Sequence, residues 1–172
     1  MGKLTLILGG ARSGKSTFAL KLAKAYKQKV AFIATAEPLD NEMRARIALH
    51  KKTRPRGWKT FEEPCNPVPL IKKIAKSFDC LLIDCLTLLV SKLSLGGLSQ
   101  KTIAKRAKEI VAAAKSSKAN AIIISNEVGM GIVPENKLAR DFRDIAGKVN
   151  QIMARGADEV FFVASGIPMK IK

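Results

Sequence analysis

Residues Gly9-Gly10-Ala11-Arg12-Ser13-Gly14-Lys15-Ser16 match the pattern G-x-x-x-x-G-K-[S/T], whose glycines let backbone N–H groups surround a phosphate chain. An apolar run of strand length precedes the motif at 4–8, and good helix formers follow it at 17–25. These flanks disfavour the alternative, a chance glycine-rich turn, and the helix N-terminus adds partial positive charge. The motif predicts a nucleoside triphosphate site, with Lys15 on the β- and γ-phosphates and the Ser16 hydroxyl on Mg²⁺.

Apolar runs of strand length alternate with helical patterns along the rest of the sequence. Strands are expected at 29–35, 78–85, 121–126 and 159–164, and helices at 41–51, 67–77, 100–115 and 134–155. The expected N-caps are Asp40, Asn66 and Ser99, and Pro134 is expected to open the last helix. Residues 58–63 are expected to be irregular or extended.

The end of the sequence predicts a hairpin. Only Ser165-Gly166 separates the strand at 159–164 from a last short strand at 167–171, and a parallel crossover needs far more residues. Pro168 suits an edge strand, because proline cannot donate a ladder hydrogen bond. Together these patterns predict an α/β fold of the P-loop NTPase type. We expect a doubly wound, mostly parallel sheet with an antiparallel C-terminal edge hairpin, in one domain over 1–172.

Composition predicts a soluble globular protein of the cytoplasm. Hydrophobic residues make up 47% and charged residues 26% of the 172 residues, as in ordinary globular domains. No apolar run approaches the ~20 residues of a membrane span, and the first strand begins too early for a signal peptide. The three cysteines are an odd number without metal-site spacing, so we expect free thiols in a reducing compartment.

The net charge of +17, from 31 Lys and Arg against 14 Asp and Glu, has two interpretations. It is typical of proteins that bind nucleic acid, and the rival hypothesis is therefore a basic, nucleic-acid-binding P-loop ATPase. The cations are spread along the chain, however, and aromatics are only 5%, so no base-stacking platform is evident. A solvated, lysine-rich surface that attracts small polyphosphates is the favoured interpretation, with no nucleic-acid partner.

Two acid-bearing features follow strand ends, where ligands bind in open α/β sheets. Asp84 ends the strand at 78–85 and fits the Walker B position, which holds Mg²⁺ beside the phosphates. The alternative for Asp84 is a loop carboxylate that caps the next element. The loop 126–134 contains two glycines and an acid, and it is either an active-site loop or an ordinary strand-to-helix connection.

His50 is the one histidine in the sequence. On the expected helix, Glu42, Arg46 and His50 are spaced four residues apart and lie on one face. Cations follow directly at 51, 52, 54 and 56, and a cationic surrounding favours the neutral imidazole that a nucleophile requires. A surface or buried structural histidine remains the alternative, because spacing alone does not distinguish the roles.

Four segments carry a resemblance to a known family. They are GGARSGKS at 9–16, FIATAEPLDNEMRARIALHKKTRPRGWKTFEEP at 32–64, LLIDCLTLLVSKL at 81–93, and SNEVGMGIVPENKLARDFRDIAGKVNQIMARGADEVFFVASGIPMKIK at 125–172. The sequence resembles, essentially end to end, the bifunctional adenosylcobinamide kinase/adenosylcobinamide-phosphate guanylyltransferase family of cobalamin biosynthesis. The resemblance implies a homotrimer that phosphorylates adenosylcobinamide with ATP or GTP. It also implies transfer of GMP from GTP onto that phosphate through a guanylylated histidine.

The resemblance also implies roles for individual residues. The family's histidine lies in an R-I-x-x-H-x-x-x-R-P segment, which is Arg46–Pro55 here, so the intermediate maps onto His50. Mg²⁺ maps onto Ser16 and Asp84, and Lys15 joins His50 as a catalytic residue. The nucleotide contacts map onto Gly9, Gly10, Ala11, Arg12, Ser13, Gly14, Lys15, Ser16, Ala34, Thr35, Ala36, Lys51, Lys52, Thr53, Arg54, Glu62 and Asp84. The connection at 93–99 is shorter than in other members, and the high net charge is not a family trait.

Overall fold

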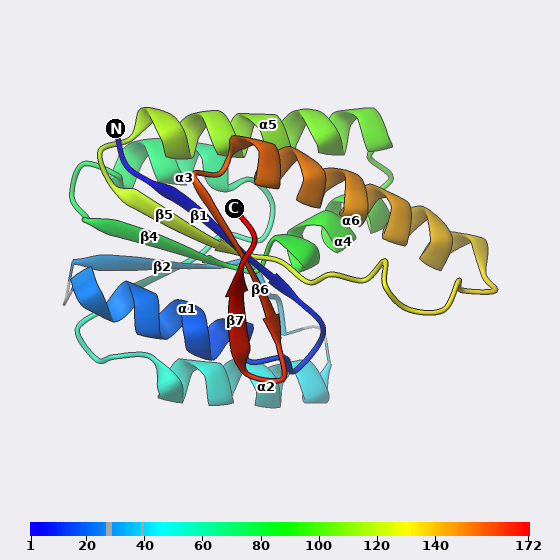
Figure 1. The fold of residues 1–172 in the computed structure, drawn as a ribbon, viewed down its shortest axis with the longest axis horizontal. Coiled ribbons are helices and arrows are strands. Elements are labelled where there is room, and N and C mark those ends of the chain that lie inside the picture. The colour runs from blue at the N-terminus through cyan, green and yellow to red at the C-terminus, as the bar shows by residue number, and fades with distance from the viewer. Residues whose placement is uncertain (27–28, 39) are drawn as a thin grey trace.

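The strands of this protein lie in one sheet with helices on both faces (Figure 1). The computed structural model describes residues 1–26, 29–38 and 40–172, and within these ranges the sheet has seven strands in the order β3-β2-β4-β5-β1-β6-β7. All neighbouring strands are parallel except β6 and β7, which pair antiparallel. The strands are β1 Leu4–Gly9, β2 Val30–Ala34, β3 Lys59–Glu62, β4 Cys80–Asp84, β5 Asn120–Ile124, β6 Glu159–Ala164 and β7 Ile167–Lys170.

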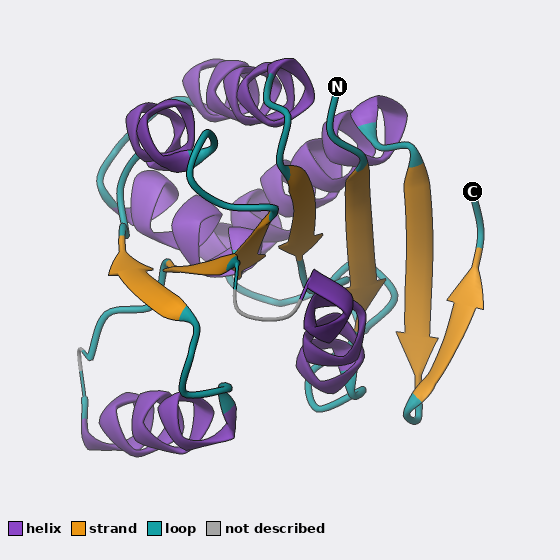
Figure 2. Ribbon diagram, turned by 90° about the vertical axis from the view of Figure 1, so that its left-hand side faces the viewer, coloured by secondary structure: helices purple, strands orange, loops and turns teal. Residues whose placement is uncertain are grey.

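The helices form two layers, which are seen on either side of the sheet in Figure 2. They are α1 Lys15–Ala23, η1 Lys24–Tyr26, α2 Asn41–Thr53, α3 Pro67–Ile74, α4 Leu86–Leu95, α5 Gln100–Ser116 and α6 Lys137–Gly156. Helices α1 and α2 lie on one side, and α3, α4, α5 and α6 lie on the other (Figure 1). The predicted doubly wound α/β fold and its C-terminal hairpin are therefore confirmed. None of the described helices has both the length and the apolarity that crossing a membrane requires.

The core consists of two apolar clusters, one on each face of the sheet. Along β1, Leu6 belongs to the cluster that includes Ile110 of α5, and Ile7 belongs to the cluster that includes Ala19 of α1. Because both faces are covered, β1 and β2 are buried along their whole lengths, and such strands have nearly continuous apolar sequences. The side chains of Asp40, Asn66 and Ser99 cap α2, α3 and α5, as predicted.

Several predicted boundaries are wrong, and the sequence prediction lacks one helix. Helix α6 begins at Lys137, not at Pro134, because the Asn136 side chain accepts a hydrogen bond from the Ala139 N–H at 2.7 Å. Helix α3 ends at Ile74 rather than at 77, and the strand predicted at 78–85 is shorter. Helix α4 follows β4 directly. Its sequence is apolar without a clear polar face, and Cys85 makes no side-chain cap, so neither signal predicts it.

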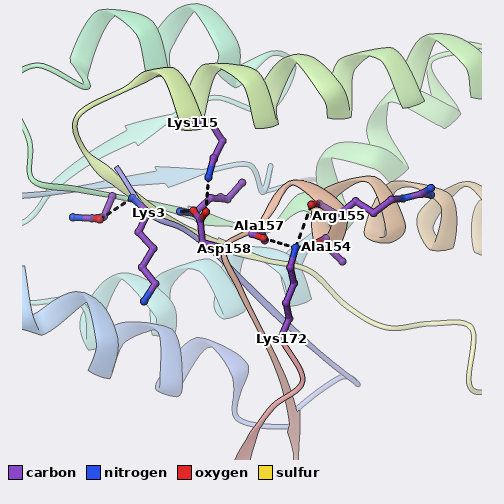
Figure 3. A network of polar contacts seen from close by, with 9 residues as sticks. Lys3, Lys115, Ala154, Arg155, Ala157, Asp158 and Lys172 are labelled. Carbon is purple, nitrogen blue, oxygen red and sulfur yellow. Dashed lines mark hydrogen bonds and ion pairs between the residues drawn. The ribbon is translucent and has the colours of Figure 1, made fainter. Parts of the chain in front are cut away.

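A polar network joins the amino ends of the strands, on the edge of the sheet opposite the P-loop (Figure 3). Asp158, just before β6, accepts a hydrogen bond from the Leu4 N–H at 2.7 Å and pairs with Lys115 of α5. The Lys172 ammonium donates to carbonyl oxygens at the end of α6, which lack helical partners. These belong to Ala154, Arg155 and Ala157. The network connects the chain's last residue, α5 and β1 at one edge of the sheet.

Candidate active site

The backbone that connects β1 to α1 requires glycine at two positions, Gly9 and Gly14. Gly9 and Gly14 have φ values of 153° and 94°, in the region that favours glycine. A Cβ added at Gly9 would lie 2.4 Å from the Val163 carbonyl oxygen and 2.7 Å from Ser13 Oγ. Both distances are too short for a real contact, so a larger residue would displace the loop. The glycines of the motif are therefore explained by the local backbone.

Two side chains of this loop are suited to hold phosphate. Lys15 is 6% exposed, and its ammonium donates to the Gly10 carbonyl oxygen at 2.5 Å. Burial lowers the pKa of Lys15, while Cys85 and Asp84 nearby oppose that effect. Ser13 Oγ is buried without a hydrogen-bond partner among the described residues. A buried polar atom without a partner is costly, and a phosphate oxygen would satisfy it.

Asp84 stands beside the loop at the carboxyl edge of the sheet, where the register pairs it with Ala34 of β2 and Ile124 of β5. The Ser16 hydroxyl donates to Asp84 Oδ2 at 3.3 Å. Burial raises the pKa of the Asp84 carboxyl, and His50, Ser16 and Arg54 oppose that rise. No group of three or more His, Cys, Asp or Glu side chains in the described ranges is arranged to hold a metal. The two oxygen donors instead fit Mg²⁺, which typically binds one or two protein groups together with nucleotide phosphates and water.

Helix α2 places His50 opposite Asp84. His50 Nδ1 lies 3.8 Å from Asp84 Oδ2, and the His50 side chain is 49% exposed. The helix begins at the Asp40 cap, whose carboxylate accepts from the Met43 N–H at 2.7 Å. Lys51, next to His50, forms a 2.9 Å ion pair with Glu62, which connects α2 to the end of β3. Asp84, at the Walker B position, and His50 are far apart in the sequence but lie close together in the structure.

Arg54 closes the same region from the end of α2. Its guanidinium lies 3.6 Å from the centre of the Phe32 ring and donates to Thr60 Oγ1 at 3.3 Å. Burial lowers the pKa of Arg54, although Asp84 and Glu62 oppose that effect. Arg54 Nε is buried without a hydrogen-bond partner among the described residues, which leaves this cation a donor for an anionic ligand.

A cavity of about 900 Å³ joins these groups. Most of the predicted site residues line it, namely Ala11, Arg12, Ser13, Gly14, Lys15, Ser16, Ala34, Ala36, His50, Lys51, Thr53, Arg54, Glu62 and Asp84. Gly9, Gly10, Thr35 and Lys52 are not among its lining residues. Thr35 is 2% exposed, and its hydroxyl donates to the Cys85 carbonyl oxygen at 2.7 Å and accepts from the Cys85 N–H at 2.8 Å. In this structure Thr35 joins β2 to the end of β4.

The cavity also contains residues that sequence reasoning does not identify. Met43 and Ile47 of α2 line it together with His50, at spacings of four and three residues. The sequence prediction builds this face from Glu42 and Arg46 instead, and the side chain of Arg46 lies outside the described residues. Apolar spacing from His50 would identify Met43 and Ile47. From the loop at 126–134, only Asn126 lines the cavity.

Comparison with known proteins identifies the family of this chain. The family described as cobinamide kinase / cobinamide phosphate guanyltransferase matches residues 5–171. The bifunctional adenosylcobalamin biosynthesis protein CobU of Salmonella typhimurium is 44% identical, over 98% of this chain and 99% of that protein. CobU of Escherichia coli is 41% identical over the same shares, and CobP of Pseudomonas aeruginosa is 40% identical over 97% and 96%. The chain therefore belongs to the cobinamide kinase / cobinamide phosphate guanyltransferase family.

Proposed function

We propose that this protein is a bifunctional transferase of cobalamin biosynthesis that uses one cavity for two reactions. It phosphorylates the hydroxyl of adenosylcobinamide, and it transfers GMP from GTP onto the resulting phosphate. Membership of a family of kinases and nucleotidyltransferases supports both reactions. The observation that carries the one-cavity proposal is the 3.8 Å approach of His50 to Asp84, beside Lys15 and Ser16.

The kinase reaction depends mainly on position and charge, because the phosphoryl transition state is loose. The substrate hydroxyl oxygen bonds to the γ-phosphorus of ATP or GTP as the bond to the β–γ bridging oxygen breaks, and the hydroxyl proton is released. Lys15 and the loop N–H groups hold the β- and γ-phosphates. Ser16 and Asp84, together with the nucleotide, would hold Mg²⁺, which would neutralise charge on the phosphates. Ser13 Oγ, buried and without a partner among the described residues, supplies a further donor.

The guanylyl transfer uses His50 as a nucleophile. A nitrogen of the neutral imidazole attacks the α-phosphorus of GTP, the bond to the α–β bridging oxygen breaks, and pyrophosphate leaves. A phosphate oxygen of adenosylcobinamide phosphate then attacks the same phosphorus, and breaking the P–N bond regenerates the imidazole. Because two displacements replace one, donor and acceptor do not need to occupy the cavity together. Lys51 and Arg54 face the cavity and provide cations for the phosphates.

We further propose that a single domain over 1–172 carries both reactions and works as a homotrimer in the cytoplasm. The free thiols of Cys65, Cys80 and Cys85 support a reducing compartment. Exposed apolar side chains support association, since isolated domains rarely expose several together. Met130 is 79% and Ile132 is 96% exposed in the loop that follows β5. Sedimentation of the purified protein tests the trimer.

Covalent labelling tests the proposed function most directly. Incubation with GTP labelled at the α-phosphate, followed by a denaturing gel, should give a labelled protein band and free pyrophosphate. ATP labelled at the same position should give no band. The label should be released by acid and survive base, as a P–N bond does. A wild-type protein that takes no label from GTP contradicts the proposed guanylyl transfer.

A further inference from the structure

Asn126 occupies the position between the P-loop and Asp84. It lies one residue beyond Ser125, at the carboxyl end of β5, and β5 stands between β4 and β1 in the sheet. β1 leads into the P-loop and β4 ends at Asp84. Asn126 lines the same cavity as Lys15, Ser16 and His50. A carboxamide therefore lies beside the place where the terminal phosphates of a nucleotide would bind.

Buried side chains hold the backbone of Asn126 from two helices. Its N–H donates to Thr87 Oγ1 of α4 at 2.6 Å, and its carbonyl oxygen accepts from Asn150 Nδ2 of α6 at 3.0 Å. Ser125 connects the two partners, donating to Asn150 Oδ1 at 2.7 Å and lying 3.2 Å from Thr87 Oγ1. Thr87, Ser125 and Asn150 are each no more than 6% exposed. A buried network in which each of these three side chains is hydrogen-bonded restrains the backbone that it holds.

The Asn126 side chain itself takes no part in this network. Among the described residues it makes no hydrogen bond, although its backbone N–H and carbonyl are both paired. The adjacent residue is also fixed, because the Glu127 N–H donates to the Gly9 carbonyl oxygen at 3.0 Å. The restrained backbone therefore positions the Asn126 carboxamide, which has two donor hydrogens and one acceptor oxygen, at the cavity.

We propose that Asn126 is a catalytic residue of the kinase reaction, whose amide donates a hydrogen bond to a non-bridging oxygen of the γ-phosphate. This inference rests on the proposed function. In the loose transition state the charge of the phosphoryl group is spread over these oxygens as it passes to the corrinoid hydroxyl, and a preorganised donor stabilises that charge. Asn126 transfers no proton. Thr87 and Asn150 are positioning residues that act through it. Guanylyl transfer develops its charge at the α-phosphate, so it depends little on Asn126.

Kinase and labelling rates of Asn126 variants test this proposal. Asn126→Ala should lower kcat for phosphorylation of adenosylcobinamide at least about tenfold, with less than about threefold change in KM for GTP. Asn126→Asp should lower kcat further, since it replaces the donor with a negative charge. The rate of His50 labelling from GTP should change less than about threefold in both variants. The matched control is Asn120→Ala, at the opposite end of β5, which should retain both activities.

A second set of variants tests positioning. Thr87→Val removes the acceptor for the Asn126 N–H and should lower kinase kcat, and Thr87→Ser should restore it. In the Asn126→Ala background, Thr87→Val should lower kcat no further, because its effect passes through Asn126. A kinase kcat of Asn126→Ala within about threefold of wild type overturns the proposal, as does an equal fall in labelling. A wild-type protein with neither activity would instead contradict the proposed function.

Discussion

At the scale of single residues, the Asp84 carboxylate lies close to two side chains, Ser16 and His50. Asp84 Oδ2 accepts the Ser16 hydroxyl at 3.3 Å and lies 3.8 Å from His50 Nδ1. The proposed kinase groups and the proposed nucleophile therefore share an edge of one cavity, but they differ in chemistry. Phosphoryl transfer requires Lys15 and the loop amides, whereas a phosphoramidate requires a nitrogen nucleophile. Single substitutions should separate the two activities.

Replacing the histidine should remove only one activity. We expect His50→Ala to abolish covalent labelling by GTP and formation of GDP-cobinamide, and to retain kinase activity at least in part. The reason is that phosphoryl transfer from the γ-position forms no intermediate on the protein. Labelling with α-labelled GTP and a separate kinase assay measure the two outcomes. A His50→Ala protein that still labels fully would assign the nucleophile to another residue.

Replacing the P-loop lysine should remove both activities. Lys15 is buried, and it lines the cavity together with His50. We expect Lys15→Ala to lower kinase activity and His50 labelling by about 100-fold or more, since both reactions use the same triphosphate cradle. Near-normal labelling in this variant would indicate a second nucleotide site. Thermal unfolding of the variant distinguishes an inactive folded protein from an unfolded one.

Local chemistry explains how much of this site the sequence predicts. The P-loop depends on residues adjacent in the chain, so the motif identifies Lys15 and Ser16 directly. The approach of His50 to Asp84 depends on where α2 lies relative to the end of β4, and only the family resemblance suggests it. The hydrogen bonds that hold the Asn126 backbone come from Thr87 of α4 and Asn150 of α6. Sequence patterns do not predict these hydrogen bonds, because α4 has no capping signal and no clear polar face.

At the scale of elements, the start of α6 differs from the sequence prediction, and the stability of two variants tests this difference. Asn136→Ala should destabilise the protein by about 1 kcal/mol, because it removes the side-chain acceptor for the Ala139 N–H. Pro134→Ala should change stability by less than about 0.5 kcal/mol, because Pro134 lies before the helix and its carbonyl group is retained. Urea unfolding measures both variants. The opposite order would return the helix start to Pro134.

The network at the amino ends of the strands should make stability depend on pH. Hydrogen bonding from the Leu4 N–H, followed by pairing with Lys115, lowers the pKa of Asp158. A carboxyl whose pKa is lowered by folding contributes stability above its unfolded pKa of about 3.9, and this is lost as pH falls through the folded pKa.

Asp158→Asn should therefore lower stability at pH 7 and weaken the further decrease of stability below about pH 4. The effect is modest, about 1 kcal/mol or less, because the Asp158 side chain is 37% exposed. Urea unfolding at several pH values measures it, and a variant with the wild-type pH profile contradicts this account. Asp158→Ala should cost more, since it also removes the acceptor for Leu4.

At the scale of the whole molecule, much of the positive charge lies away from the proposed site. Helices α3 and α5 cover the face of the sheet opposite α1 and α2 (Figure 1). Exposed lysines of α5 at 101, 105 and 108 share one stripe, because their spacings are four and three residues. None of the three makes an ion pair with another residue in the described ranges, and no cavity-lining residue belongs to α5. The stripe has the character of a solvated cationic surface.

This surface allows a test between the proposed enzyme and a nucleic-acid-binding ATPase. We expect wild-type binding to duplex DNA to be weak and to vanish by physiological salt, since it would depend on counterion release alone. Replacing Lys101, Lys105 and Lys108 together with glutamine should make the slope of log K against log salt shallower, by up to about 0.9 for each phosphate that is no longer neutralised. Kinase and labelling rates should not change, because these side chains are remote from the cavity. Tight, salt-resistant binding of a defined nucleic acid that disappears together with activity in the triple variant would favour the rival function instead.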